Sequence, residues 1–508
     1  MNKNFYITTP IYYPSAKPHM GHAYTSIIAD FFARFKKIDG FNVHFLTGTD
    51  EHGLKIQRSA EKNNMKPKDF CDQISKTFED LTKILNLSNT DFIRTTENRH
   101  INSVLNLWKI LEDNNQIYLS KYTGWYSVSD EAFYQNDEIE TKEGKKYSTS
   151  SGSLVEWVEE ESFFFKLSEW EKPLLKFYEE NPKFILPEAR KNEVISFVKN
   201  GLKDLSVSRK TFSWGIKIPT NEQHIIYVWL DALTNYISAL NFPNTKDNLY
   251  KKFWPADIHI IGKDILRFHA IYWPAFLMAA SLPLPKRVYG HGWILSGDEK
   301  MSKSKNNILD PLEIIEQYGL DALRYYLLKE VSFGNDGNIS QEKLENCINS
   351  DLANNYGNLC QRVLAFCEKN CDLVVPSHEF SKDDLNVLLP FENLNKLRNL
   401  IDNQNINVYM NFLIEMLFAS NKYFNDQEPW KKKDNKIRLN TIVFTALELI
   451  RKISILLYPV IPETSLKVLK IFGIDEKTIN FESMSKHESL KVGISLSKIN
   501  ILFKKIEK

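Results

Sequence analysis

Cysteine is scarce in this sequence of 508 residues, which leaves little material for thiol chemistry. The five cysteines never form a CxxC pair, and three of them, Cys360, Cys367 and Cys371, fall close together at helix-like spacing. Thiolate zinc sites need closer pairs or neighbouring histidines, and disulfide frameworks are typical of small secreted chains. The sequence therefore predicts buried structural thiols rather than a disulfide framework or a thiolate metal site.

An excess of charge and a long apolar run are also missing. The formal net charge is +1, so a surface for nucleic acid would have to be a local patch. No basic-then-apolar signal segment opens the chain, and its apolar stretches are too short and too interrupted to cross a bilayer. We expect a soluble, cytoplasmic protein without membrane contact. Its length suggests roughly three domains at about 150 residues each.

Strand and helix patterns alternate in parts of the chain. The segments that predict strands are 5–9, 43–50, 257–264 and 287–295. Between the first two, an apolar-periodic run over 20–37 predicts a helix that stops at Asp39-Gly40. Strand–helix units in succession predict a parallel sheet with crossover helices, and hence an α/β fold of the Rossmann type.

The sequence changes character twice beyond this pattern. Over Tyr118–Gln223, aromatic residues, Gly, Ser and acidic clusters replace the alternation, which predicts an inserted domain. From about residue 310 to 471, amphipathic stretches predict an all-α helical bundle. The remaining segment, 472–508, is rich in lysine and predicts a helix over Ser497–Lys508.

Two histidines follow the first predicted strand, in Pro18-His19-Met20-Gly21-His22. A helix N-terminus offers phosphate free N–H groups and the positive end of a dipole. Gly21 leaves room for a nucleotide to approach, and His19 and His22 share one helix face. Both can donate hydrogen bonds to ATP phosphates. The alternative is two ordinary surface histidines near a helix cap.

Two lysines lie about 280 residues downstream, in Lys300-Met301-Ser302-Lys303-Ser304, after the last predicted strand. Lysines on a mobile loop can close over a triphosphate and stabilise departing pyrophosphate, electrostatic help worth roughly 3–4 kcal/mol per donor. A solvated Lys/Ser loop is the alternative.

Together these motifs resemble the HIGH and KMSKS elements of class I aminoacyl-tRNA synthetases. TTPIYYPSAKPHMGH, YVWLDALTNY and IGKDILRFH are similar to segments of the methionyl-tRNA synthetase family, and the resemblance covers essentially the whole chain. It implies a ligase that activates L-methionine with ATP and Mg²⁺, and transfers it to elongator and initiator tRNA(Met). The residues with an implied catalytic role are His19, His22, Lys300 and Lys303.

The resemblance also implies a domain plan. The expected ranges are 1–117 and 225–345 for the two halves of a Rossmann-type catalytic domain, 118–224 for a connective insertion, 346–471 for a helical anticodon-binding domain and 472–508 for a C-terminal extension. Some family members dimerise through an added C-terminal domain of about a hundred residues, and the roughly 37 residues after the bundle are too few for one, so a monomer is expected.

Two neighbouring ligand sites are implied as well. Methionine contacts are implied for Ile11, Tyr13, Asp50, Trp229, Ala232, Tyr236, Ile265 and His269. ATP contacts are implied for Pro10, His19, Gly21, His22, Gly262, Lys263, Asp264, His291, Gly292, Trp293, Ile294, Lys300 and Lys303. Aromatic rings suit a thioether, at about 0.3–1.5 kcal/mol per S···aromatic contact. Asp50 can pair with the ammonium group. Core packing is the alternative for the aromatic residues, and an N-cap is the alternative for Asp50.

Many members of the family carry two Cys pairs in the insertion, which form a zinc knuckle. The residues that stand in their place are Ser127, Asp130, Ser148 and Ser151. Serine hydroxyls do not replace thiolates as zinc ligands, so we expect the knuckle without structural zinc.

The resemblance assigns anticodon reading to Asn358, Arg362 and Trp430. Asn358 and Arg362 lie four apart on one predicted helix face, and Trp430 precedes three lysines. RNA loops are read by stacking on aromatic side chains and by hydrogen bonds to base edges. Packing of Trp430 within the bundle is the alternative.

Three other functions fit the sequence less well. Synthetases for branched amino acids carry a much larger insertion than the ~105 residues present, and the cysteinyl enzyme needs a thiolate zinc site. The intact histidine and lysine motifs argue against a catalytically silent tRNA-binding protein. The anticodon-type bundle argues against a nucleotidylyltransferase that does not use tRNA.

Overall fold

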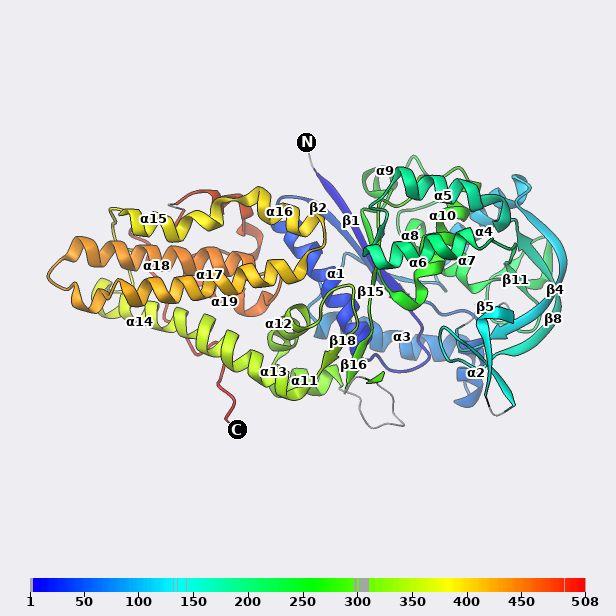
Figure 1. The fold of residues 1–508 in the computed structure, drawn as a ribbon, viewed down its shortest axis with the longest axis horizontal. Coiled ribbons are helices and arrows are strands. Elements are labelled where there is room, and N and C mark those ends of the chain that lie inside the picture. Colours follow the sequence, from blue (N-terminus) through cyan, green and yellow to red (C-terminus); the bar gives the residue numbers. More distant parts are fainter. Residues whose placement is uncertain are drawn as a thin grey trace. The chain divides into compact units, whose positions relative to one another are not determined.

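A computed structural model describes residues 3–130, 132–134, 136–142, 144–296, 299–300, 310–487 and 489–507 (Figure 1). The described chain forms two compact units. The one that we call the sheet unit comprises Asn4–Ala29 and Val43–Gly292, and the one that we call the helical unit comprises Met1–Lys3, Asp30–Asn42 and Trp293–Lys508. Among the helices of the described residues, none has the length and apolar character that a bilayer crossing requires.

A parallel sheet forms the centre of the sheet unit. Within the described residues its strand order is β3-β2-β1-β14-β15-β9. The strands are β1 (Asn4–Tyr12), β2 (Asn42–Thr49), β3 (Asp91–Arg94), β9 (Ile185–Leu186), β14 (Ile258–Gly262) and β15 (Val288–His291). The pairs β2–β3, β1–β14, β14–β15 and β15–β9 are parallel, which confirms the predicted α/β fold.

The order of the strands creates a switch point beside β1. The chain runs from β1 through β2 to β3 on one side of β1. Its later strands β9, β14 and β15 lie on the other side, where β14 pairs with β1 and Ile7 lies opposite Ile258. Ligands of open parallel sheets bind outside the carboxyl ends of the strands at such a reversal. The segments that follow β1 and β14 are therefore the first places to look for a site.

Helices connect these strands. Helix α1 (Met20–Ile38) follows β1, buries an apolar stripe and ends before Gly40, whose φ of 82° suits glycine. It matches the predicted helix over 20–37, and the boundary between the two units falls within it. The other helices of the sheet unit are α2 (Leu54–Lys62), α3 (Pro67–Ile84), α4 (Asn98–Asp113), α5 (Glu171–Glu180), α6 (Glu188–Lys199), α7 (Val228–Leu233), α8 (Asn235–Ser238), α9 (Asn248–Phe253) and α10 (Trp273–Ala279).

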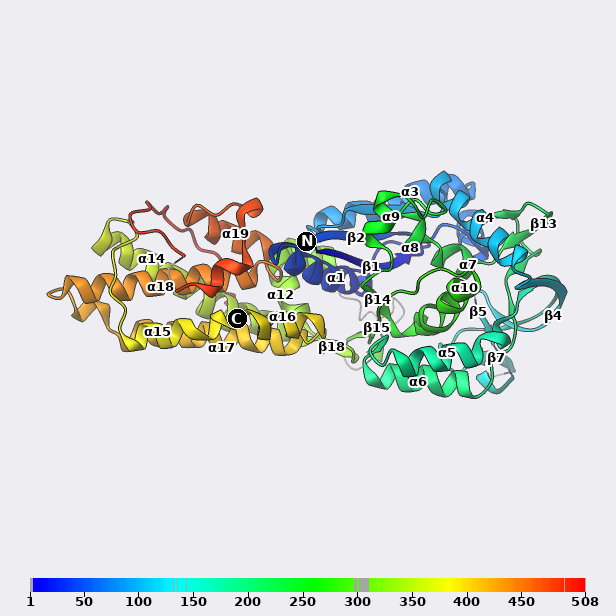
Figure 2. The ribbon, with the colours of Figure 1, turned by 90° about the horizontal axis from the view of Figure 1, so that it is seen from above.

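Antiparallel strands occupy much of the range in which an insertion is expected. The long pair β4 (Ile117–Ser127) and β8 (Glu156–Phe165) is joined by β5 (Ala132–Tyr134) and β10 (Leu205–Ser206). The remaining strands are β6 (Ile139–Lys142), β7 (Lys145–Ser148), β11 (Ser208–Arg209), β12 (Lys217–Ile218) and β13 (Asn221–Ile226). From the same range, α5 and α6 pack side by side (Figure 2), and β9 adds an edge strand to the parallel sheet.

The strand expected over 287–295 is wrong as a single element. β15 ends at His291, and β16 (Ile294–Ser296) belongs to a different small sheet, in the helical unit, with β17 (Glu299–Lys300) and β18 (Gly337–Ile339). Trp293 explains the break. Its backbone N–H donates to Asp336 Oδ1 at 2.8 Å, and its carbonyl accepts from Gly337 N, so its backbone bonds leave the parallel sheet.

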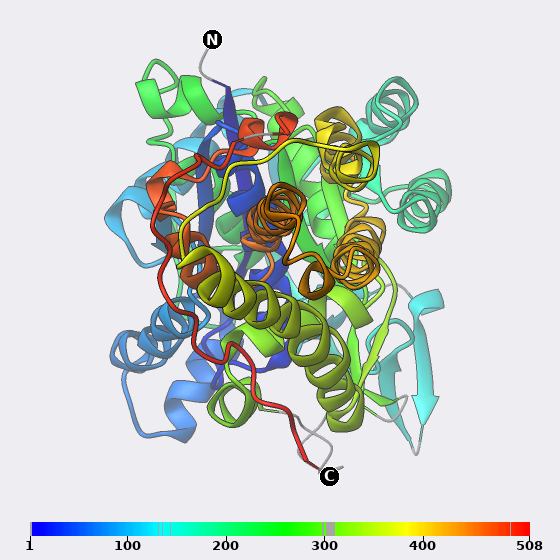
Figure 3. The ribbon, with the colours of Figure 1, turned by 90° about the vertical axis from the view of Figure 1, so that its left-hand side faces the viewer.

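Helices make up most of the helical unit. In Figure 3 its long helices, yellow to orange, are seen nearly end-on. The α-helices of this unit are α11 (Pro311–Tyr318), α12 (Leu320–Glu330), α13 (Gln341–Cys347), α14 (Asn358–Cys371), α15 (Lys382–Leu388), α16 (Leu394–Asp402), α17 (Ile406–Asp426), α18 (Lys436–Leu457) and α19 (Pro462–Ile471). The predicted bundle is present. α14 carries the three clustered cysteines, of which Cys360 and Cys367 are buried.

The helix expected over Ser497–Lys508 is wrong. Residues 497–507 contain no helix, and the segment before them pairs with another part of the bundle: Leu496 N–H donates to Leu373 O, and Val375 N–H donates to Ile494 O. Farther on, Asn349 exchanges two hydrogen bonds with the backbone of Ile506. The backbone groups of this segment thus bond to the bundle instead of to one another.

Candidate functional site

The two motif histidines lie where β1 leads into α1. Their rings are stacked, with centroids 3.7 Å apart. His22 Nδ1 accepts from the backbone N–H of His19, and His19 Nδ1 accepts from Gly21 N–H, each at 3.1 Å. A Cβ on Gly21 would lie 3.0 Å from the His19 ring, so glycine lets that ring fold back. In each ring, Nδ1 is therefore the accepting nitrogen.

The surroundings of His22, above all its burial, keep its imidazole neutral. Burial lowers its pKa well below the ordinary value, and the neighbouring His19 and Lys55 add to the effect. A neutral imidazole whose Nδ1 accepts a hydrogen bond carries its proton on Nε2. At the N-terminus of α1, such a group can donate to a phosphate oxygen.

Asp50 lies directly after β2, at the carboxyl edge of the sheet. It is 2% exposed, and its backbone N–H donates to Tyr12 O, the last residue of β1, at 2.9 Å. Helix α2 begins at Leu54 with Gly53 as its N-cap, so the N-cap alternative for Asp50 is wrong. The carboxylate is thus placed beside the switch point by the sheet itself.

Aromatic side chains from two distant segments stack near this edge. Trp229 on α7 lies face to face with Phe268, with centroids 3.7 Å apart and planes within 5°. Tyr236 OH lies 2.7 Å from His269 Nε2, and His269 Nδ1 lies 3.0 Å from Ile265 O. Burial lowers the pKa of His269 to about 4, so the neutral ring donates from Nδ1 to the carbonyl and accepts from the Tyr236 hydroxyl. The arrangement forms a rigid, apolar wall.

The other residues expected to contact methionine lie in the same part of the fold. Ile11, Tyr13 and Ile265 pack, partly buried, against the hydrophobic cluster that contains Trp229. Ala232 is buried one turn of α7 after Trp229. The sheet unit therefore brings together three segments that are far apart in sequence. The sequence analysis assigned no role to Phe268, although this residue directly precedes His269 in the segment IGKDILRFH.

The nucleotide candidates follow β1, β14 and β15. Pro10 lies within β1, and β14 ends at Gly262, where a Cβ would come within 2.5 Å of Asp264 Oδ1. Lys263 and the exposed Asp264 form the short turn that comes next. This turn lies at the switch point of the sheet.

His291 ends β15, opposite Gly262 in the register, and Gly292 follows it. Its Nε2 lies 2.8 Å from Thr25 Oγ1 on α1, and its Nδ1 lies 2.8 Å from Gly292 O. Burial lowers the pKa of His291. Both ring nitrogens are thus engaged within the protein, where they join the end of β15 to α1.

Four further candidates belong to the other unit or lie beyond the described residues. Trp293 and Ile294 lead into β16 of the helical unit. The backbone of Lys300 pairs in β17 with Leu295. Lys303 lies within 301–309, outside the described residues, as does most of the lysine motif.

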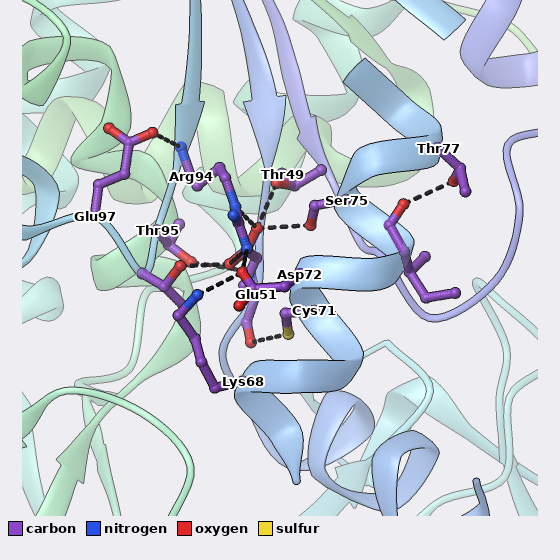
Figure 4. A network of polar contacts seen from close by, with 12 residues as sticks. Thr49, Glu51, Lys68, Cys71, Asp72, Ser75, Thr77, Arg94, Thr95 and Glu97 are labelled. Atoms are coloured by element: carbon purple, nitrogen blue, oxygen red, sulfur yellow. Dashed lines mark hydrogen bonds and ion pairs between the residues drawn. The ribbon is translucent and has the colours of Figure 1, made fainter. Parts of the chain in front are cut away.

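A polar cluster beside Asp50 also escaped the sequence analysis. Glu51 is fully buried among hydroxyl donors and Arg94 (Figure 4). His52 Nδ1 and His100 Nε2 each lie 2.7 Å from Asp231, one on each oxygen of the carboxylate. Burial opposes ionisation of Asp231, but the two histidines hold its pKa below the ordinary value.

The expected knuckle positions come together through hydrogen bonds. They are Ser127, Asp130, Ser148 and Ser151. Asp130 accepts from Ser151 Oγ at 2.6 Å, Ser153 Oγ at 2.8 Å and Tyr134 OH at 2.8 Å, and its N–H donates to Ser127 Oγ. Ser148 Oγ accepts from the backbone N–H of Ser151. These oxygen-rich partners do not fit zinc, which prefers thiolates and imidazoles. The absence of zinc stays a prediction.

The three anticodon candidates lie in the helical unit, and two of them, Arg362 and Trp430, contact Phe424. The Arg362 guanidinium lies 5.7 Å from the centroid of that ring and donates to Asn425 Oδ1 at 2.5 Å. Trp430 meets the same ring edge-on at 6.4 Å and is 41% exposed. Asn358 begins α14, one turn before Arg362. A half-exposed indole and a guanidinium on one patch can stack on and bond to bases.

Comparisons with known proteins agree with this geometry. The family model described as class I tRNA synthetases (M) matches residues 5–364, and the model of the anticodon-binding domain of methionyl-tRNA ligase matches residues 388–508. The chain is 47% identical to a methionine–tRNA ligase of Rickettsia felis, over 100% of the chain and 99% of that protein. It is 48% identical to one of Brucella suis, over 93% and 92%. The structure of Mycobacterium tuberculosis methionyl-tRNA synthetase in complex with methionyl-adenylate matches with a TM-score of 0.96 and 42% identity, over 99% of each chain.

Proposed function

The chain belongs to the methionyl-tRNA synthetases of class I, and from this premise we propose how its residues divide the two steps of methionine–tRNA ligation. In the first step, the carboxylate of methionine attacks the α-phosphate of ATP, which yields methionyl-adenylate and releases pyrophosphate. In the second, a ribose hydroxyl of the terminal adenosine of tRNA(Met) takes the methionyl group and AMP leaves. No covalent enzyme intermediate is required, so catalysis rests on positioning and electrostatics.

His19 and His22 serve the phosphates. Their Nε2–H groups stand at the N-terminus of α1, next to the switch point of the sheet. A neutral His22 donates without needing to titrate, so its contribution is constant across neutral pH. Lys300 and Lys303 add positive charge where pyrophosphate departs.

Mg²⁺ enters with ATP. In the part of the chain that the structure describes, no group of three or more His, Cys, Asp or Glu side chains is placed to hold a metal ion. This fits an ion that is held mainly by phosphate oxygens and water, as Mg²⁺ often is. When bound, it neutralises charge on the phosphates. Gly262, Lys263 and Asp264 would hold the ribose and adenine beside them, with the segment from His291 to Ile294.

Asp50 and the aromatic wall serve methionine. The buried carboxylate pairs with the ammonium group, because an ion pair shielded from water is stronger than an exposed one. Trp229, Tyr13 and the Tyr236–His269 pair surround the flexible thioether side chain with polarizable rings. Ile11, Ala232 and Ile265 complete the apolar lining.

Anticodon reading falls to the patch around Phe424. Trp430 offers a ring on which a base can stack, and Arg362 and Asn358 offer donors for base edges. Phe424 contacts both the indole and the guanidinium.

This proposal rests on one observation. His22, Asp50 and the aromatic wall lie together at the carboxyl edge of one parallel sheet. Exchange of labelled pyrophosphate into ATP should depend on methionine when each of the twenty amino acids is supplied alone. His22→Ala should lower that exchange. Stronger exchange with leucine, isoleucine or valine would overturn the methionine assignment.

A further inference from the structure

Glu51 is held by an unusually complete set of hydrogen bonds. Five reach its buried carboxylate: Arg94 donates twice, from Nε at 2.5 Å and from Nη2 at 3.0 Å, and three hydroxyls donate once each (Figure 4). The hydroxyls belong to Thr49 at 2.8 Å, Ser75 at 2.6 Å and Thr96 at 2.5 Å. The partners come from β2, α3 and the end of β3, so the carboxylate joins three elements.

The backbone of Glu51 is fixed as well. Its N–H donates to Thr95 Oγ1 at 2.9 Å, and its carbonyl accepts from Trp214 Nε1 at 2.5 Å and from Cys71 Sγ at 3.4 Å. With both peptide groups and the side chain bonded, Glu51 cannot turn about its own backbone without breaking several hydrogen bonds. The orientation of the preceding residue, Asp50, is set by the same peptide unit.

His52 continues the restraint on the other side. It donates from Nδ1 to Asp231, whose second oxygen accepts from His100 Nε2, and all three side chains are buried. Asp231 lies on α7 between Trp229 and Ala232, which line the methionine side. Residue 52 is thereby tied to the helix that carries the aromatic wall.

We propose that Glu51 and His52 are positioning residues that aim the carboxylate of Asp50 at the ammonium group of methionine. The inference rests on the proposed function of Asp50. Glu51 fixes Asp50 to the sheet, and His52 fixes it to the wall that holds the methionine side chain. The distance between the two halves of the amino acid site is then constant. A misplaced carboxylate would weaken binding of the ammonium group alone, whereas a general loss of structure would weaken every contact.

The test compares methionine with 4-(methylsulfanyl)butanoate, which is methionine without its amino group. The readout is the inhibition constant of this analogue divided by the KM for methionine, both from pyrophosphate exchange. Glu51→Gln keeps the shape of the side chain but removes its charge. We expect the KM for methionine to rise and the ratio to fall by about tenfold, with the KM for ATP changed less than about twofold.

Asp72→Asn is the matched control. Asp72 is an exposed second partner of Arg94, so its loss changes the same guanidinium without touching Glu51. The control should leave the ratio unchanged. An equal fall in both variants would show that Glu51 acts only on the fold, and would overturn the proposal.

Asp50→Asn separates this inference from the proposed function. If Asp50→Asn lowers the ratio and Glu51→Gln does not, the positioning role is wrong while the role of Asp50 survives. If Asp50→Asn leaves the ratio unchanged, the ammonium site itself has been misassigned.

Three further variants test the role of His52 and provide for the case in which Glu51→Gln misfolds. His52→Ala should lower the ratio, and His52→Asn, whose amide can donate from about the position of Nδ1, should restore it. Should Glu51→Gln fail to fold, Ser75→Ala removes only one donor and should give a smaller fall in the same ratio. No change in a folded Ser75→Ala or His52→Ala protein would count against the proposal.

Discussion

Glu51 shows how a single buried charge can be kept inside a protein. Burial alone would favour its neutral form, but the hydrogen bonds from Arg94, Ser75 and Thr96 outweigh that effect and lower its pKa. A carboxyl whose pKa falls on folding stabilises the folded state above its unfolded pKa of about 4.3. That stabilisation is lost as the pH falls through the lower, folded value.

The first prediction follows from the direction of this pKa shift. Glu51→Gln leaves Arg94 without its buried partner and should lower the free energy of unfolding by about 3 kcal/mol at pH 7. Urea unfolding of both proteins should show that this difference shrinks between about pH 5 and pH 3, since only the wild type loses the charge. A difference that stays constant over this range would show that the carboxylate contributes no charge to stability.

At the scale of residues, the sequence points to candidates where the chemistry is local. His19 and His22 could be found because they lie three residues apart at the start of one helix, and Asp50 because it follows a strand. Asp231 could not be found as a partner of His52, because 179 residues separate them and only the folded sheet brings them together. The same holds for the stacking of Phe268 on Trp229.

Elements were predicted well where the apolar period repeats over many residues. The helix expected over 20–37 is Met20–Ile38, and the strand expected over 43–50 is Asn42–Thr49. The wrong predictions, over 287–295 and 497–508, fall where the backbone forms hydrogen bonds to residues far away in sequence. A local pattern carries no information about such partners.

The second prediction concerns how the segment after α19 is held on α18. Lys452 is buried, and its Nζ donates to the carbonyls of Met484 at 2.7 Å and Lys486 at 2.8 Å. Burial lowers its pKa to about 8, against an unfolded value of about 10.4. The unfolded chain then binds more protons between these values, so this lysine makes stability rise with pH over that window.

Lys452→Met removes the titration, so the free energy of unfolding should rise less between about pH 7.5 and pH 10 than in the wild type. One pKa unit corresponds to about 1.4 kcal/mol, which sets the scale of the effect. Lys470→Met, an exposed lysine of α19, is the control and should keep the wild-type slope. Identical slopes for all three proteins would show that Lys452 is not shifted.

The third prediction concerns the insertion and its metal. Elemental analysis of dialysed protein should find well under one zinc per chain, because Asp130 and its hydroxyl partners already satisfy one another. A chelator should leave the melting temperature unchanged. Stoichiometric zinc that resists dialysis would contradict the argument.

At the scale of the whole molecule, the methionine-site candidates and the anticodon candidates fall in different units. His22 and Asp50 belong to the sheet unit, and Arg362 and Trp430 belong to the helical unit. Formation of the adenylate needs no anticodon, whereas charging of tRNA needs both units. Substitutions in the two places should therefore separate the partial reactions.

The fourth prediction uses that separation. Trp430→Ala removes the stacking of one base, about 1–3 kcal/mol, and should lower the efficiency of tRNA charging roughly 5- to 150-fold. Methionine-dependent pyrophosphate exchange should remain near wild type, whereas His22→Ala should depress both assays. Leu389→Ala, another exposed apolar side chain of the helical unit, should change neither. Normal charging by a well-folded Trp430→Ala protein, judged by thermal melting, would refute the anticodon assignment.

The serine and aspartate cluster of the insertion has a consequence for oxidative damage. A thiolate knuckle is a target for peroxide, which converts cysteine to sulfenic and then to irreversible acids and ejects the metal. All five cysteines of this chain lie outside 118–224, and the hydroxyl and carboxylate oxygens around Asp130 offer an oxidant nothing to attack. A cysteine knuckle would depend on thiolates that peroxide oxidises, whereas this loop is held by hydroxyl and carboxylate groups that are inert to redox chemistry. Peroxide stress should therefore spare this part of the enzyme.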